Sequence, residues 1–163
     1  MNRRNVASVL LVISDAGMLA WGAMAALAPE RLPGPGSAPI VAAGYEGFTR
    51  SSWQELVHAS PGTAAYIILL FRLYGAYIVV YSILAIAITL VAFRRGDAWA
   101  WWSLLIGNAI AFGAAMTYDW TVNAIGPFEM SEYLGLALIL GAFALTAPFV
   151  RSNQPAVVAM RPL

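Results

Sequence analysis

The sequence contains no cysteine and no lysine, and it has one histidine among 163 residues. Without cysteine, the chain cannot form a disulfide, a thiolate metal site or a thiol nucleophile. One histidine cannot supply both axial ligands of a bis-histidine haem within one chain. The sequence also lacks a glycine-rich phosphate loop, a His-Glu-x-x-His motif and a Gly-x-Ser-x-Gly turn. These absences predict no resident cofactor, no metal site and no catalytic residue.

Charge is scarce as well. Charged residues make up 10% of the chain and hydrophobic residues 61%, whereas an ordinary soluble domain is roughly 25% charged. This balance is typical of a protein whose main partner is the lipid bilayer. The net charge is +1 and the nine arginines are scattered along the chain, so no nucleic-acid partner is expected.

A membrane-spanning helix needs roughly 20 mainly apolar residues. The sequence contains four apolar runs of about this length or longer. They cover about residues 6–27, 64–93, 98–116 and 132–150. Arg3 and Arg4 precede the first run as in a signal peptide, but the run is long and Asp15 interrupts it, so a retained helix is expected. The predicted fold class is an all-α membrane protein, a four-transmembrane-helix bundle in a single domain of residues 1–163, with a tail at 151–163.

The longest segment between the runs covers residues 29–60. Its first half is rich in proline and glycine and is expected to be irregular. In its second half, Ser52 and Glu55 form a capping-box pattern that predicts a short helix. Trp53 would place that helix at the depth of the lipid headgroups, and an ordinary surface loop is the alternative.

Aromatic residues also gather at the start of the third run. Trp99, Trp101 and Trp102 predict an aromatic belt at a membrane interface. Residues 117–131, between the third and fourth runs, are expected to form a short acidic loop in which Pro127 breaks any helix.

The arginines predict the orientation. If the chain crosses the membrane four times, six of them fall on one side: Arg3, Arg4, Arg94, Arg95, Arg151 and Arg161. The other side holds two arginines and six acidic residues: Arg31, Arg50, Glu30, Glu46, Glu55, Asp119, Glu129 and Glu132. Because basic residues mark the cytoplasmic side, both termini are expected in the cytoplasm and residues 29–60 outside. The composition, rich in alanine, glycine and arginine, suggests the cytoplasmic (inner) membrane of a bacterium.

Asp15 and Arg72 are the two ionisable residues well inside the predicted spans. A charge at the bilayer centre costs about 2.5 kcal/mol or more and usually faces a partner. The estimated depths of the two residues differ by less than about 10 Å, which an arginine side chain can largely bridge. We therefore expect Asp15 and Arg72 to face the bundle interior and interact, either to fix helix register or to handle a proton or ligand. Asn108, near the midplane, and Asp119, a rival partner for Arg72, are further buried polar candidates.

Two helix faces of small and weakly polar residues predict close packing between helices. They are Ser8, Leu11, Asp15, Met18, Gly22 and Ala25 in the first run, and Arg72, Gly75, Val79, Ser82, Ile86 and Thr89 in the second. Tyr74, Tyr77 and Tyr81 follow a different stripe of the second run. These tyrosines either pack in the core or against lipid, or they stack on a ligand.

Three stretches carry a resemblance to a known group. They are Phe-Arg-Leu-Tyr-Gly at residues 71–75, Phe-Arg-Arg-Gly-Asp-Ala-Trp-Ala-Trp at 93–101, and the Gly-x-x-Gly-Phe-Thr…Trp-x-x-Leu pattern at 44–56. The chain is broadly similar to the DoxX-like four-helix proteins, small integral membrane proteins of bacteria, over most of residues 44–150. The resemblance implies four helices. Members of this group mostly lack an assigned activity, so it implies no catalytic residue.

Three functions remain open from the sequence. The lack of catalytic motifs favours a non-enzymatic protein. It would be either an accessory or scaffold subunit, with other subunits or copies as partners, or a lipid or ligand binder. A small proton-coupled transporter would use Asp15, which sits where four-helix multidrug exporters carry an essential acid, although Arg72 would tend to neutralise it. A membrane enzyme acting on a lipid or quinone would use a pocket lined by Asp15, Arg72, Asn108 and Asp119. A metal site of outer carboxylates and His58 is disfavoured by their spacing.

Overall fold

The computed structural model describes residues 2–35, 38–123 and 127–152, and most of the predicted tail, residues 153–163, lies outside them. The helices in chain order are α1 (Arg3–Leu27), η1 (Pro29–Arg31), α2 (Ile40–Thr49), α3 (Trp53–Ala59), α4 (Pro61–Val91), η3 (Phe93–Arg95), α5 (Ala98–Val122) and α6 (Pro127–Ser152). Within the described residues the chain is helical and has no strand. Four helices, α1, α4, α5 and α6, are long and apolar enough to cross a membrane. The predicted all-helical fold with four candidate spans is therefore confirmed.

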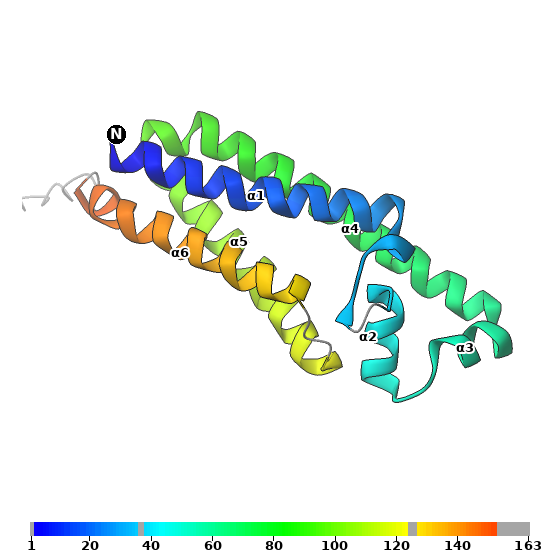
Figure 1. The fold of residues 1–163 in the computed structure, drawn as a ribbon. Coiled ribbons are helices and arrows are strands. Elements are labelled where there is room, and N and C mark those ends of the chain that lie inside the picture. The colour runs from blue at the N-terminus through cyan, green and yellow to red at the C-terminus, as the bar shows by residue number, and fades with distance from the viewer. Residues whose placement is uncertain (1, 36–37, 124–126, 153–163) are drawn as a thin grey trace, which may run out of the picture.

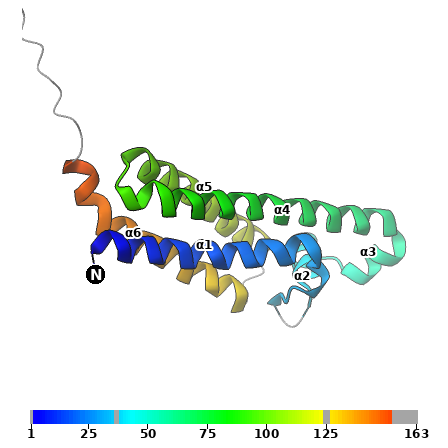
Figure 2. The same ribbon diagram turned by 90° about the horizontal axis from the view of Figure 1, so that it is seen from above.

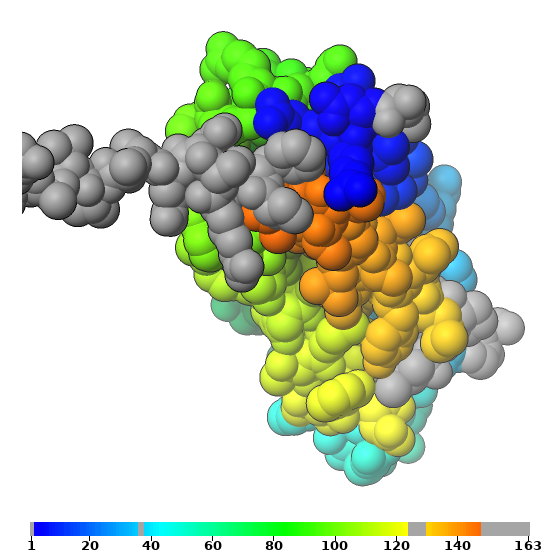
Figure 3. All heavy atoms as spheres, turned by 90° about the vertical axis from the view of Figure 1, so that its left-hand side faces the viewer, coloured from blue at the N-terminus to red at the C-terminus, as the bar shows by residue number. Residues whose placement is uncertain are grey.

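The four long helices run alternately up and down the bundle. The start of α1 and the end of α6 consequently lie at the same end of the molecule (Figure 1). Figure 3 views that end and shows α1 in blue and α6 in orange beside the green turn between α4 and α5. The guanidinium group of Arg4 donates a hydrogen bond of 3.1 Å to the carbonyl oxygen of Arg95 there, which ties α1 to that turn.

Two helix pairs diverge from this end. Helices α1 and α4 lie side by side along the length of α1 (Figure 2), whereas α5 and α6 turn away from them toward the opposite end (Figure 1). The apolar core accordingly lies where the pairs are close, and includes Leu11, Phe93, Leu104, Ile139 and Phe143. The divergence leaves space between the pairs farther along the bundle.

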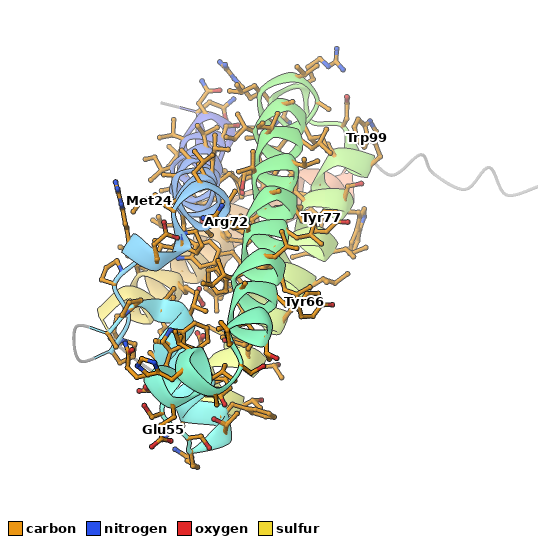
Figure 4. The ribbon with its side chains drawn as sticks, turned by 90° about the vertical axis from the view of Figure 1, so that its right-hand side faces the viewer. Met24, Glu55, Tyr66, Arg72, Tyr77 and Trp99 are labelled. Atoms are coloured by element: carbon orange, nitrogen blue, oxygen red, sulfur yellow. The ribbon has the colours of Figure 1, made fainter. Side chains whose placement is uncertain are left out.

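The tryptophans at the start of α5 do not all face outward. Trp99 and Trp102 are about half exposed, as an aromatic belt requires. Figure 4 shows Trp99 at the surface of the bundle. Trp101 instead turns toward α6, where its Nε1 donates a hydrogen bond of 3.0 Å to Oγ1 of Thr146 and its ring packs on Phe143. Trp101 therefore joins two helices and contributes to the core.

Helices α1 and α4 approach each other closely at two glycines. A Cβ atom added to Gly75 would lie 2.5 Å from the backbone nitrogen of Ala26, and one added to Gly22 would lie 2.8 Å from Cγ2 of Ile78. Only glycine lets the two backbones approach this closely. The two predicted faces of small and weakly polar residues are largely buried, and together they form what we call the α1–α4 seam. Its buried members are Ser8, Leu11, Asp15, Gly22 and Ala25 on α1, and Gly75, Ser82 and Thr89 on α4. Arg72 is the clear exception, because it is exposed.

Besides the short helix η1, the segment between α1 and α4 contains one α-helix that was predicted, α3, and one that was not, α2. The hydroxyl of Ser52 accepts a hydrogen bond of 3.5 Å from the amide of Glu55, so Ser52 caps the start of α3, where the sequence pattern predicted a helix. Trp53 packs edge-on against Tyr45 of α2 at 5.6 Å between ring centroids. Helix α2 contains two glycines, which disfavour a helix, and it forms because its apolar face packs on the bundle.

Helices α5 and α6 are longer than predicted, and the acidic loop between them is correspondingly shorter. The hydroxyls of Thr117 and Thr121 each donate a 2.7 Å hydrogen bond to a carbonyl one turn earlier, so both polar side chains are satisfied within α5. Pro127 is the first residue of α6, where its missing amide hydrogen costs no helical hydrogen bond. The expectation that Pro127 breaks a helix was therefore wrong, because it begins one.

Candidate functional site

A cavity of about 450 Å³ lies between α1, α4, α5 and α6, where the two helix pairs diverge. Its size falls within the roughly 300–1,000 Å³ of typical ligand pockets. Most of its lining is apolar or aromatic, and the aromatic side chains are Trp21, Tyr74, Tyr77, Tyr81 and Phe112. The tyrosine stripe considered from the sequence is thus part of a cavity wall.

Small residues make room for the cavity. Gly17 and Gly135 line it from α1 and α6, and Ala111 and Ala115 line it from α5. A Cβ atom added to Gly17 would meet no atom within 4 Å, so the space in front of this glycine is open. Gly17 and several other lining residues are exposed, so the cavity is open at its side rather than sealed.

Asp15 and Ser82 lie at one depth of the bundle, near the end of the cavity that lies toward the turn between α4 and α5, which we call its inner end. Gly22 of α1 packs close to the backbone of Gly75 on the antiparallel α4. Asp15 and Ser82 each lie seven residues, or about two helical turns, farther along from that contact. Both residues are 0% exposed. They therefore sit at the same level within the α1–α4 seam.

Tyr81 and Asn108 belong to the same level. The hydroxyl of Tyr81 lies against Gly107 of α5, where an added Cβ would be 3.1 Å from the hydroxyl oxygen. Asn108 follows directly and is 2% exposed. The carboxyl group of Asp15 interacts electrostatically with Tyr81, whose ring also lines the cavity. Three helices thus contribute polar groups to one layer.

Most polar atoms of this layer lack a hydrogen-bond partner. They are both carboxyl oxygens of Asp15, the hydroxyl oxygens of Tyr81 and Ser82, and the amide oxygen of Asn108. The amide nitrogen of Asn108 is satisfied, since it donates 2.9 Å to the carbonyl of Leu104. A buried unsatisfied group costs about 1–3 kcal/mol, so a layer of them is expensive for packing alone. This arrangement indicates a functional site.

The predicted interaction between Asp15 and Arg72 is wrong. Arg72 instead forms an ion pair with Glu30, at 3.6 Å between Nη2 and Oε2, and its side chain is 44% exposed. Figure 4 shows Arg72 on α4 beside the end of α1. Because Gly75 packs on the last turn of α1, Arg72 lies level with the residues just after α1 ends. Asp15 is therefore roughly 20 Å deeper, which is beyond the reach of an arginine side chain.

The reason for this error is the length of α4. It begins at Pro61, three residues before the predicted start, and its first turns extend past the end of α1 (Figure 2). The apolar run at residues 64–93 does not reveal this offset, so it places Arg72 too deep in the bundle. An ion pair as exposed as that of Arg72 and Glu30 contributes only about 0–1 kcal/mol.

The other acidic candidate, Asp119, lies nearer the end of the bundle where α2 packs on α5. Asp119 is half-buried on α5 and interacts electrostatically with Tyr74 and Tyr118, but it does not line the cavity. Glu132 does line it, although the sequence placed this residue only on an outer acidic surface. Ser14 donates a 3.5 Å hydrogen bond to the carbonyl of Gly135, so Glu132 lies about one turn from the depth of Asp15.

Among the described residues, no three histidine, aspartate or glutamate side chains converge as a metal site would require. No family model, no curated protein and no solved structure matches this chain. The interpretation of the site therefore depends on its geometry.

Proposed function

We propose that the protein is a non-enzymatic integral membrane protein that binds a lipophilic small molecule between α1, α4, α5 and α6. The observation that carries this proposal is the cavity of about 450 Å³, lined mainly by aromatic and aliphatic side chains. Pockets for small molecules combine such a lining with a few polar groups that orient the ligand. The layer of Asp15, Tyr81, Ser82 and Asn108 supplies those polar groups at the inner end of the cavity.

The ligand would reach the cavity through the bilayer. Tyr74, Tyr77 and Ile110 line the cavity and are also exposed. All three lie within helices that are long and apolar enough to cross a membrane. An opening at that depth faces hydrocarbon, so the ligand must itself be soluble in lipid. This argument favours a lipophilic molecule over a water-soluble one.

A matched pair of glycine substitutions tests the proposal. Gly17→Phe would fill the open space of the cavity. Gly113→Phe is the control, because an added Cβ at Gly113 of α5 also meets no atom within 4 Å, but Gly113 does not line the cavity. We expect Gly17→Phe to weaken binding of the neutral fluorophore N-phenyl-1-naphthylamine at least tenfold, and Gly113→Phe to leave it unchanged. Binding is measured by fluorescence on purified protein in detergent, with protein-free micelles as background.

Equal binding by the two variants would contradict the proposal, because the fluorophore would then bind somewhere other than the cavity. Absence of binding by the unmodified protein would contradict it as well. Both variants add the same side chain to an open position, so a general effect of phenylalanine on folding would appear in both and be recognised.

The orientation that we propose places both termini in the cytoplasm and α2 and α3 outside the cytoplasmic membrane of a bacterium. The arginine distribution supports it, since basic residues favour the cytoplasmic side. Because the chain has no cysteine, each introduced cysteine is unique. A membrane-impermeant maleimide should label Ser51→Cys in intact cells, and should label Arg94→Cys only after the cells are opened. The reverse pattern, or labelling of both in intact cells, would refute this topology.

One observation favours a second candidate, a small proton-coupled transporter. Arg72 was expected to neutralise Asp15, but it pairs with Glu30, and neither carboxyl oxygen of Asp15 has a hydrogen-bond partner. An unpaired acid inside a membrane bundle is a common element of proton relays. Equal ligand uptake into proteoliposomes by the unmodified protein and by Asp15→Asn would exclude this role.

A further inference from the structure

The charged groups around the cavity have one sign. Glu132 is the ionisable acid in its lining, and Asp15 adjoins the lining residue Ser14 and interacts with the cavity tyrosine Tyr81. No arginine or histidine of the described residues lines the cavity. The basic residue nearest in sequence to the cavity tyrosines, Arg72, is engaged with Glu30 beyond the end of α1. The electrostatic environment of a bound molecule is therefore set by carboxyl groups.

The aromatic lining acts in the same direction. Trp21 of α1 packs against Tyr74 of α4 with ring centroids 5.8 Å apart and an interplanar angle of 80°. Tyr77, Tyr81 and Phe112 extend this lining along α4 and onto α5. The faces of aromatic rings attract cations, by about 0.5–1 kcal/mol when exposed and by about 2 kcal/mol when desolvated. A neutral molecule would gain nothing from this property, and an anion would be repelled by it.

The two acids lie close in depth, on neighbouring helices. Asp15 belongs to α1 and Glu132 to α6, and the hydrogen bond from Ser14 to Gly135 places them within about one helical turn of each other. Charges interact more strongly at a site of low dielectric than in water. A single positive group in the inner half of the cavity would therefore be attracted by both acids.

The cation must also carry apolar surface. The lining is mostly hydrocarbon, and the described residues contain no group of three potential ligands for a metal ion. A small hydrated ion would lose its water without gaining enough oxygen ligands. An organic cation with its charge surrounded by apolar groups meets both requirements.

We infer that the cavity selects a lipophilic organic cation, with Asp15 and Glu132 as its counter-charges and Trp21, Tyr74 and Tyr81 as the aromatic surfaces against which it packs. This inference rests on the proposed ligand-binding function. It adds the sign of the ligand's charge, which ligand binding alone does not require.

Two isosteric probes of opposite charge test the inference. Tetraphenylphosphonium and tetraphenylborate have nearly the same shape and hydrophobicity. We expect the purified protein in neutral detergent to bind the phosphonium at least tenfold more tightly than the borate, as measured by isothermal titration calorimetry. Titration of each probe into protein-free micelles corrects for partitioning.

Substitutions then locate the selectivity. Asp15→Asn and Glu132→Gln keep the shape of each side chain and remove its charge, so each should lower the affinity for tetraphenylphosphonium about tenfold. Glu55→Gln, on the exposed helix α3 far from the cavity, should leave it unchanged (Figure 4). Elution of each variant as one symmetrical peak shows that it is folded. If Asp15→Asn fails that criterion, Glu132→Gln alone decides.

Equal or tighter binding of tetraphenylborate would overturn the inference, as would unchanged phosphonium affinity in both Asp15→Asn and Glu132→Gln. The glycine pair separates this failure from failure of the proposed function. If Gly17→Phe abolishes binding of the neutral fluorophore while the two charged probes bind alike, the cavity binds ligands without charge selection. If Gly17→Phe and Gly113→Phe bind the fluorophore alike, the ligand-binding proposal itself fails and this inference fails with it.

Discussion

Replacing Gly75 with valine is expected to lower the free energy of unfolding by roughly 3 kcal/mol, at the upper end of the range for overpacked sites. An added Cβ at this position lies 2.5 Å from the backbone nitrogen of Ala26 and 2.7 Å from the carbonyl carbon of Ala25. Neither atom can move without displacing α1 as a whole, because both belong to its backbone. The midpoint of unfolding in dodecyl sulfate titrations, followed by circular dichroism, measures the loss.

Gly113→Val is the matched control for this substitution. It introduces the same β-branched side chain into another candidate membrane-spanning helix, at a position where an added Cβ meets no atom within 4 Å. Its unfolding midpoint should stay close to that of the unmodified protein. Equal destabilisation by Gly75→Val and Gly113→Val would mean that helix propensity, and not the close approach of α1 and α4, determines the effect.

Replacing Asp15 with leucine is expected to raise the free energy of unfolding by about 2 kcal/mol, because a buried carboxyl without a partner is exchanged for an apolar group of similar shape. The side chain of Asp15 is 0% exposed, and neither of its oxygens has a hydrogen-bond partner. Leucine has the same branching as aspartate and loses no interaction on burial. The same dodecyl sulfate titration measures the gain.

Asp97→Leu provides the comparison for Asp15→Leu. Asp97 precedes α5 and forms an ion pair of 3.3 Å with Arg95, so its replacement should not stabilise the protein. A fall in stability for Asp15→Leu would show that the carboxyl group makes a favourable interaction in the folded protein. A rise would mean that the chain retains a costly group at this depth, as is common where a residue serves function rather than stability.

The four candidate spans and the buried seams could be predicted because they depend on local pattern. Apolar runs of sufficient length identify the spans, and the heptad spacing of Gly22, Gly75 and Ser82 identifies the faces that pack. Helix α2 could not be predicted in this way, since Gly44 and Gly47 argue against a helix that packing on the bundle nonetheless stabilises.

The site was less accessible from sequence because it depends on register between distant segments. Asp15 and Asn108 were correctly identified as buried polar residues. The ion pair of Arg72 with Glu30 was not predicted, because the depth of Arg72 is decided by where Gly75 meets Ala25 and Ala26. Glu132 was missed as a lining residue because its place follows from the divergence of α5 and α6, which no local pattern reports. The spacing of Tyr74, Tyr77 and Tyr81 was the one feature of the sequence that pointed to the cavity.

The contact between α2 and α5 has a consequence for control of the cavity. Gly44 of α2 lies directly against the hydroxyl of Tyr118 on α5, so a larger residue at position 44 would displace the tyrosine side chain. The same helix α5 carries Phe112 and Ala115 into the cavity, within two turns of Tyr118. A displacement of α2 would therefore shift Tyr118 and, through α5, one wall of the proposed ligand cavity. The segment that joins α1 and α4 would in this way change the space available to a molecule held between the long helices.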